Sequence, residues 1–262
     1  MNTKVNDLYT YLKGLGKVCV AFSAGIDSSF LLEAANRALD GNVLAIMAKG
    51  AMMPQKELEY GREFCKQRSI RLVEIEANEF SIEAFVNNTS DRCYHCKNGI
   101  FSKIIKVAGE NGFDIVAEGT NSDDSNDYRP GKRALRELGV KSPLLGCGFT
   151  KQEIRECAKA MDIEIWDKPS AACLATRVPT GEKVTPELLK RIEMSEDFLK
   201  EMGFKQVRVR VHGQLARIET TPDEIEKLCR SDVRGLVSSR LKEVGFRFVS
   251  VDLDGYRTGN MN

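Results

Sequence analysis

Residues 18–39 read VCVAFSAGIDSSFLLEAANRAL, and this stretch determines the fold that we expect. Its apolar beginning, 18–22, predicts a short buried strand, and the spacing of apolar residues in 28–39 predicts a helix. The small-residue loop 23–28 joins the two and aims free N–H groups and the positive dipole end of the helix at one point. Gly25 lets a ligand approach the backbone closely, and the serine at each end of the loop adds a hydroxyl donor. The stretch therefore predicts a pyrophosphate-binding site.

The hexamer SAGIDS at 23–28 matches neither of two familiar phosphate loops. It lacks the lysine of a Gly-x-x-x-x-Gly-Lys-Ser/Thr loop, and no Gly-x-Gly-x-x-Gly follows the strand. It resembles instead the SGGxDS loop of the N-type ATP pyrophosphatases, which split ATP between its α and β phosphates and adenylate a substrate. Ala24 stands in place of the first glycine of that loop. The resemblance implies that ATP phosphates bind at Ser23, Ala24, Gly25, Ile26, Asp27 and Ser28. The alternative is an ordinary strand–turn–helix in which serine and aspartate only cap the helix.

The composition is that of an ordinary globular chain that exceeds one average domain. The 262 residues are 42% hydrophobic and 29% charged, with a net charge of +1. This balance attracts neither nucleic acid nor a membrane surface, so we expect neither as a partner. The N-terminus has no signal-peptide apolar core, and no apolar run approaches the roughly 20 residues that span a bilayer. We therefore expect a cytoplasmic protein.

Strand and helix signals alternate along the first part of the chain, which predicts an α/β fold with a parallel sheet and helices on both faces. After residue 39 we expect strands at 43–48, 71–75 and 114–117, helices at 54–67, 99–108, 129–138 and 150–161, and extended pieces at 142–145 and 163–166. Ligands bind outside the carboxyl ends of the strands in such sheets. We therefore expect the adenine and ribose of ATP near Lys49, Gly119 and Thr120. Asp123 and Asp124 follow in the same loop and either bind Mg²⁺ or are only solvated.

From about Thr185 the pattern changes to that of a small α+β domain. We expect helices at 185–202, 221–229 and 232–244 and strands at 206–211, 215–219 and 246–252. The chain thus divides into an ATP pyrophosphatase domain at 1–180 and a substrate or oligomerisation domain at 181–262. Arg208 and Arg210 alternate along a half-exposed strand and share one face. Two adjacent guanidinium groups can grip a phosphate, although a solvated strand face has the same pattern.

Three of the eight cysteines differ from the rest. Cys93 and Cys96 form a Cys-x-x-Cys, which suits zinc, an iron–sulfur centre, a redox dithiol or no special role. Cys173 precedes Arg177 by four positions, and a nearby cation favours a nucleophilic thiolate; the alternative is a buried loop cysteine. Four others lie within strand or helix patterns and are expected in the core: Cys19, Cys65, Cys157 and Cys229.

Five segments resemble the LarE family when taken in this order: SAGIDS, RCYHCK, EGTNSDD, KPSAACLATR and VRVRVHGQLARIE. The resemblance extends from about Leu8 to Asp254. Members of the family are ATP-dependent sulfur transferases that help to build the nickel-pincer nucleotide cofactor of lactate racemase. The resemblance implies that a carboxylate of a pyridinium mononucleotide is adenylated, that pyrophosphate leaves, and that sulfur then displaces AMP to give a thiocarboxylate. It also implies roles for particular residues: Asp27 for Mg²⁺ or for orienting the loop, Arg208 and Arg210 for a phosphate, Glu196 and Glu219 near substrate or metal, and Arg177 for the substrate phosphate or the adenylate.

The family has two sulfur sources. In one, a single protein cysteine gives up its sulfur and becomes dehydroalanine, and in this chain that cysteine would be Cys173. In the other, three cysteines hold a [4Fe–4S] cluster whose remaining iron carries a spare sulfide, and Cys93, Cys96 and Cys173 lie in the matching segments. We expect the cluster version, with Cys173 as the sacrificial donor in the alternative. Because the family forms hexamers, we also expect a homo-oligomer.

Two other functions stay open on the sequence. A tRNA thiolase of the same superfamily would need to bind RNA, for which the small net charge and the lack of interleaved aromatic and basic residues give little support. A non-catalytic nucleotide or iron–sulfur carrier would keep the phosphate loop but release no pyrophosphate.

Overall fold

The computed structural model describes residues 3–126, 130–168 and 173–257, and the chain divides into two compact units. The first unit consists of Met1–Ile82 and Asp91–Ala171, and the second of Glu83–Ser90 and Ala172–Asn262. This division differs from the expected boundary at 180/181 because the short segment 83–90 pairs with the chain near that boundary. The side-chain amide of Asn88 donates to the carbonyls of Val178 and Pro179 at 3.2 and 2.7 Å.

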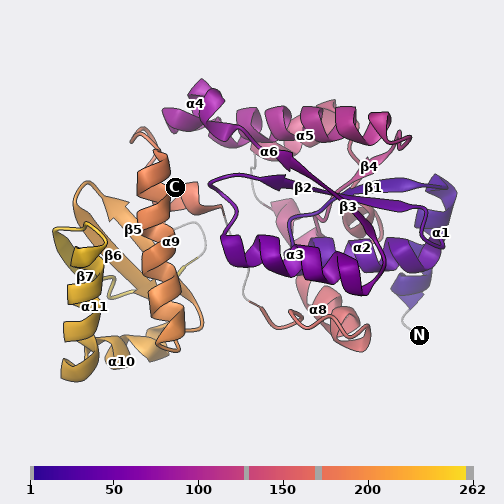
Figure 1. The fold of residues 1–262 in the computed structure, drawn as a ribbon. Coiled ribbons are helices and arrows are strands. Elements are labelled where there is room, and N and C mark those ends of the chain that lie inside the picture. The colour runs from indigo at the N-terminus through magenta and orange to yellow at the C-terminus, as the bar shows by residue number, and fades with distance from the viewer. Residues whose placement is uncertain (1–2, 127–129, 169–172, 258–262) are drawn as a thin grey trace. The chain divides into compact units, whose positions relative to one another are not determined.

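The first unit contains a four-stranded parallel sheet in the order β3-β2-β1-β4 (Figure 1), which confirms the predicted α/β class. Every pairing within it is parallel, with Val18 opposite Val43 and Cys19 opposite Val116. The strands are β1 (Val18–Ala21), β2 (Val43–Lys49), β3 (Arg71–Glu76) and β4 (Val116–Ala117). The helices are α1 (Thr3–Leu15), α2 (Ile26–Ala38), α3 (Gln55–Gln67), α5 (Arg92–Glu110), α6 (Pro130–Glu137), α7 (Pro143–Gly146) and α8 (Lys151–Ala160), with 3₁₀ turns η1 (Glu79–Ser81) and η2 (Ser122–Asn126).

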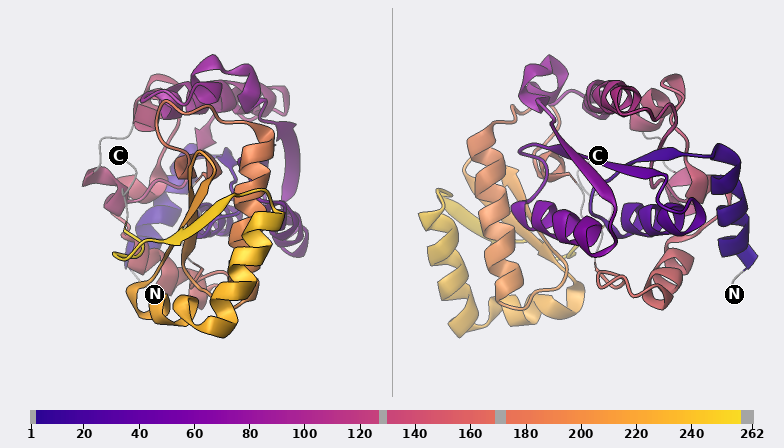
Figure 2. Two further views of the ribbon diagram at one scale, coloured as in Figure 1. Left: turned by 90° about the vertical axis from the view of Figure 1, so that its left-hand side faces the viewer. Right: turned by 45° about the vertical axis from the view of Figure 1, so that its right-hand side comes forward.

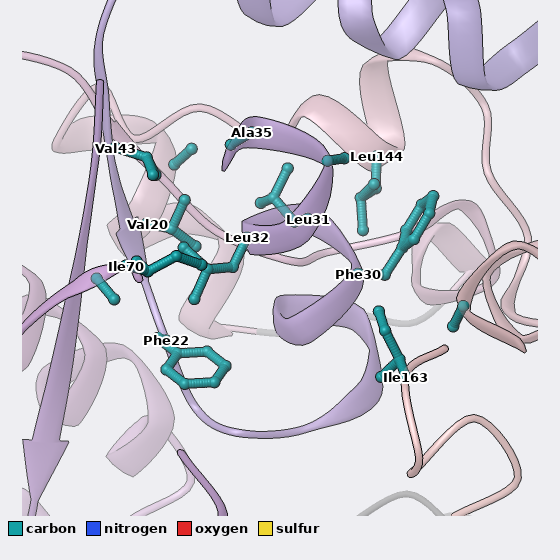
Figure 3. Close-up of a cluster of buried hydrophobic side chains, with 14 of the residues drawn as sticks. Val20, Phe22, Phe30, Leu31, Leu32, Ala35, Val43, Ile70, Leu144 and Ile163 are labelled. Carbon is teal, nitrogen blue, oxygen red and sulfur yellow. The ribbon is translucent and has the colours of Figure 1, made fainter. Parts of the chain in front are cut away.

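The alternation of side chains along β1 creates two separate cores, one on each face of the sheet. Val18 and Val20 face a cluster with α1, α2, α3 and α8, part of which Figure 3 shows around Phe22 and Phe30. Cys19 and Ala21 face a second cluster with α5 and α6 on the opposite side of the sheet (Figure 1). Because both faces are covered, the strands read as continuous apolar runs, which is why the sequence predicts them well.

Several local expectations for the first unit are wrong. Helix α5 begins at Arg92 rather than near Gly99, since the N–H groups of Tyr94 and His95 already donate to the carbonyl of Asp91. The piece at 142–145 is helix α7, because proline at the first helical position presets the backbone for a helix. Residues 163–166 form a turn and not a strand. Helix α1 was not expected, and Arg129, the expected start of α6, lies outside the described residues.

The second unit is built on a three-stranded sheet in the order β5-β6-β7, with α9 and α11 on one face (Figure 2). The hairpin β5 (Val207–His212) and β6 (Leu215–Thr220) is antiparallel, and β7 (Phe248–Val251) runs parallel to β6. The remaining elements are α4 (Glu83–Val86), η3 (Leu174–Arg177), α9 (Pro186–Glu201), η4 (Pro222–Glu224), α10 (Ile225–Cys229) and α11 (Ser231–Glu243). Thr185 caps α9 by accepting from the N–H of Leu188 at 3.2 Å, and proline follows it at the first helical position.

Two burial predictions fail in this unit. Strand β5 is buried on both faces instead of one, because its arginines lie among carboxylates and not in solvent. Cys229 at the end of α10 is exposed, whereas Cys19, Cys65 and Cys157 are buried as predicted. Among the described residues, no helix combines the length and the apolar content that crossing a bilayer requires.

Candidate functional site

The hexamer Ser23–Ser28 links β1 to α2 at the carboxyl end of the sheet, as the sequence predicts. Gly25 precedes the helix in an extended conformation, with φ −82° and ψ 163°. Two serine hydroxyls close the loop: the Oγ atoms of Ser23 and Ser28 are hydrogen-bonded at 3.1 Å, and that of Ser28 donates to the carbonyl of Gly25 at 3.0 Å. The first N–H groups of α2 have no partner within the helix and are available to an anion, which the helix dipole favours.

Ala24 occupies the position where the resembling loops carry glycine, and its φ of 57° lies in the left-handed region. Its methyl group is fully buried against α3. A Cβ on Gly61 of α3 would lie only 3.3 Å from the Cβ of Ala24 and 2.9 Å from the sulfur of Met47. A glycine on α3 therefore supplies the room that an alanine in the loop requires.

Gly119 brings the loop after β4 directly onto the phosphate loop. A Cβ at this position would lie 2.9 Å from the nitrogen of Ser28 and 3.1 Å from the carbonyl carbon of Asp27. The next residue, Thr120, donates from its N–H and its hydroxyl to Glu118 Oε2, at 3.1 and 2.8 Å. The structure thus brings Gly119 to the start of α2, while the placement of adenine and ribose there stays a prediction.

Asp27 forms an ion pair with a lysine that the sequence reasoning missed. The ammonium of Lys151 lies 2.5 Å from Asp27 Oδ2, whereas Asp27 Oδ1 is buried with no hydrogen-bond partner among the described residues. Lys151 is the first residue of α8, and its N–H donates to Asp123 Oδ2 at 2.8 Å. The available signal was the capping box at Thr150, which predicts a helix N-terminus beginning with a lysine, but not which carboxylate that lysine meets.

The other polar side chains at this edge of the sheet are engaged within the protein. The ammonium of Lys49 lies 3.1 Å from Glu76 and 3.5 Å from Glu74, and these carboxylates, Glu76 first, raise the pKa of Lys49. Asp124 Oδ2 accepts from the N–H of Asn121 at 3.2 Å. The two aspartates of this loop therefore organise the loop backbone, which leaves Asp27 Oδ1 as the carboxylate oxygen that suits a cation.

The Cys-x-x-Cys lies in the first turns of α5 and not in a polar loop. Cys93 and Cys96 are three residues apart and so share one face of the helix. Cys93 is exposed, with its sulfur 4.0 Å from the guanidinium of Arg92, while Cys96 is buried, with its sulfur 4.0 Å from that of Met52. Cys173 belongs to the second unit, where it precedes η3. In the part of the chain that the structure describes, no three His, Cys, Asp or Glu side chains gather into a metal site.

The second unit brings together the arginines and glutamates that the sequence singled out. Arg177 and Glu196 form a buried bidentate ion pair at 2.8 and 2.9 Å, and Glu196 Oε1 also accepts from the N–H of Val209 on β5. Arg210 pairs with Glu219, which is fully buried, at 2.9 Å. Glu219 also accepts from Arg217 at 3.1 Å.

Arg208 adds a third buried guanidinium to this cluster. Its side chain lies over the ring of Tyr256, and burial together with the charge of Arg177 lowers its pKa. Three buried arginines thus face two buried glutamates, Glu196 and Glu219, and the excess positive charge suits an anion. The cluster also holds the segment that carries Cys173, because Arg177 donates to the carbonyl of Cys173 at 3.0 Å and Arg210 to that of Thr176 at 3.0 Å.

Comparison with known proteins places the chain in a family. No family model matches it. It is 33% identical over 261 residues to the pyridinium-3,5-bisthiocarboxylic acid mononucleotide synthase of Lactiplantibacillus plantarum, covering 99% of this chain and 94% of the relative. It is also 33% identical over its whole length to an uncharacterized protein of Synechocystis, of which it covers 98%. A more distant similarity, 23% identity over 160 residues, relates 58% of the chain to 52% of one subunit of the glutamine-hydrolyzing GMP synthase of Halorubrum lacusprofundi. The chain therefore belongs to the family of the Lactiplantibacillus synthase, the LarE family.

Proposed function

We propose that this protein is an ATP-dependent sulfur transferase that converts a carboxylate of a pyridinium mononucleotide into a thiocarboxylate. The observation that carries the proposal is the similarity to a synthase of this product class over 99% of the chain, with the strand–loop–helix at Ser23–Ser28 intact. Such a thiocarboxylate is a building block of the nickel-pincer cofactor of lactate racemase, the pathway that the resemblance to the LarE family implies.

The first step is activation of the carboxylate, which is a poor electrophile. A carboxylate oxygen of the substrate attacks the α-phosphorus of ATP, the bond from that phosphorus to the bridging oxygen breaks, and pyrophosphate leaves with the electron pair. The N–H groups of the loop Ser23–Ser28 and the dipole of α2 stabilise the charge that develops on the pyrophosphate. Asp27 Oδ1, buried and without a partner among the described residues, suits Mg²⁺, which when bound neutralises phosphate charge.

The second step exchanges AMP for sulfur. A thiolate or sulfide attacks the acyl-adenylate carbonyl and AMP leaves. Cys93 and Cys96, on one face of α5, and Cys173 in the second unit are the residues that would hold a [4Fe–4S] cluster. Such a cluster, when bound by three thiolates, supplies an iron with an open position for a transferable sulfide. In the alternative, the Cys173 thiolate attacks, its Cα loses a proton and its Cβ–S bond breaks, which leaves dehydroalanine and the product thiocarboxylate.

The buried cluster of Arg177, Arg208 and Arg210 is the proposed site for the phosphate of the mononucleotide. Its support is the excess of guanidinium groups over carboxylates and the bond from Arg177 to the Cys173 carbonyl. Glu196 and Glu219 orient two of these arginines. An anion bound by the cluster would thereby be tied to the segment that carries the sulfur donor.

The test is incubation of the full chain with Mg²⁺, ATP and the pyridinium acid under strict exclusion of oxygen. Release of AMP and pyrophosphate together with exchange of one carboxylate oxygen for sulfur in the product mass is the expected result. Binding of ATP without pyrophosphate release would refute the proposal in favour of a carrier. Mössbauer and visible spectra of the anaerobic protein report a cluster, and loss of hydrogen sulfide from the Cys173 peptide after turnover reports the sacrificial route.

We also propose that the protein is a homo-oligomer. The second unit exposes the apolar side chains of Leu236, Phe248 and Leu253, and β7 is an edge strand of its sheet. Exposed apolar surface beside an open strand edge favours association with another chain. Light scattering after size-exclusion chromatography measures the mass, and a hexamer is expected.

A further inference from the structure

The ion pair between Lys151 and Asp27 connects α8 to the phosphate loop and is not explained by the steps above. The two charged atoms are 2.5 Å apart, and the side chains are 22% and 25% exposed, respectively. A partly exposed pair of this kind contributes little net stability, so exchange for a stronger partner is easy. The structural question is what the ammonium of Lys151 binds when Asp27 is occupied.

Helix α8 holds Lys151 at the loop through contacts that do not involve its ammonium. Thr150 and Glu153 form a complete capping box at the start of the helix. Glu153 is in turn fixed by Lys4 of α1 at 2.7 Å, and the N–H of Lys151 donates to Asp123 at 2.8 Å. The backbone of Lys151 is therefore fixed beside the N-terminus of α2, and only its flexible side chain has to move to change partner.

The other lysines near this edge of the sheet are held elsewhere. Lys49 lies between two carboxylates of β3, and Lys132 donates to the backbone carbonyl of Asp124. Lys151 is thus the lysine whose ammonium contacts the loop Ser23–Ser28 in the described part of the chain. A triphosphate on this loop would bring several negative charges close to Asp27, and a cation already in place offsets that repulsion.

We infer that Lys151 is a phosphate-binding residue of the adenylation step, an inference that rests on the proposed function. When ATP binds, the ammonium leaves Asp27 for a non-bridging oxygen of the β-phosphate. Asp27 is then available to the metal ion. As the bond between the α-phosphorus and the bridging oxygen breaks, the electron pair goes to the departing pyrophosphate, and Lys151 stabilises that charge without transferring a proton.

The test compares Lys151→Met with Lys159→Met in the full chain. Lys159 is on the same helix, and its ammonium lies 4.3 Å from the centre of the Trp166 ring, so this control removes an equal charge from α8. Calorimetric titration with magnesium pyrophosphate and with AMP separates phosphate binding from nucleoside binding. We expect Lys151→Met to weaken pyrophosphate binding at least tenfold, to leave AMP binding unchanged, and to slow pyrophosphate release about 10²–10³-fold, as loss of one charge-stabilising donor does. Lys151→Arg, which keeps the charge, should recover part of both losses.

Three results would overturn the inference. One is a folded Lys151→Met protein that binds pyrophosphate like the Lys159→Met control. Another is an equal loss of AMP and pyrophosphate affinity, which would mean that Lys151 only positions the loop through Asp27. The third is a Lys151→Arg protein no better than Lys151→Met; this comparison also decides the matter if the methionine variant does not fold. A wild-type protein that binds pyrophosphate but never releases it from ATP would contradict the proposed function and leave the binding comparison valid.

Discussion

Replacing Gly119 with alanine should disturb the phosphate loop from outside it. The new Cβ would lie 2.9 Å from the nitrogen of Ser28, roughly 0.6 Å closer than the ~3.5 Å at which non-bonded atoms attract most strongly. Its neighbours are backbone atoms of α2, so no flexible side chain can yield, and overpacking of this kind costs about 1–3 kcal/mol. A shift of the loop by about half an ångström should lower kcat/KM for ATP about tenfold, since 1 Å of misplacement costs about 10²-fold.

Urea denaturation and the rate of pyrophosphate release measure the two effects separately. Gly109→Ala is the matched control, because Gly109 lies in α5 and a Cβ there meets nothing within 4 Å. This control should raise the free energy of unfolding by about 0.5–1 kcal/mol and leave the kinetics unchanged. A Gly119→Ala protein as stable as the control, with wild-type kcat/KM for ATP, would refute the close approach on which this reasoning depends.

Three further predictions concern other parts of the molecule. Glu196→Ala removes the carboxylate that pairs with buried Arg177, and should lower the free energy of unfolding by about 3–5 kcal/mol in urea denaturation. The bond from Lys4 and then that from the backbone of Thr150 lower the pKa of Glu153 from 4.5, so its pair stabilises the fold above that pH and is lost as the pH falls through the lowered value; Glu153→Gln should therefore cost about 0.2–1 kcal/mol at neutral pH and nothing in acid, measured by denaturation at both. Burial raises the pKa of two thiols to about 12, so mass spectrometry after brief alkylation of the cluster-free protein at mildly alkaline pH should find exposed Cys93 and Cys229 modified and Cys19 and Cys65 untouched.

The parallel sheet was predictable because each of its strands is a short apolar run bounded by polar turns. The predicted and observed bounds of β1, β2 and β3 agree within a residue or so. The errors fall where the local signal is ambiguous. The start of α5 is rich in charged residues and carries two cysteines, so it lacks the apolar spacing of a helix. The piece at 163–166 has the alternation of a strand, yet it is a turn between α8 and the end of the first unit.

Charged residues on β5 show a second kind of error. Alternation of valine and arginine normally indicates a strand with one solvated face. Here Arg208 and Arg210 are both 5% exposed, because Glu219 from β6 and the segment around η3 cover that face. Burial of an arginine depends on the carboxylates that reach it from distant parts of the chain, and no local pattern reports them.

The sequence by itself determined the phosphate loop, the order of strands and helices around it and the membership of a sulfur-transferring family, because each is encoded in contiguous residues. Only the tertiary structure decided which side chains meet that loop. Lys151 reaches Asp27 from 124 residues away, and Gly119 packs on the backbone of Ser28. Contacts of that kind follow from the way parallel strands gather their carboxyl ends at one edge, which brings together loops that are far apart in the chain.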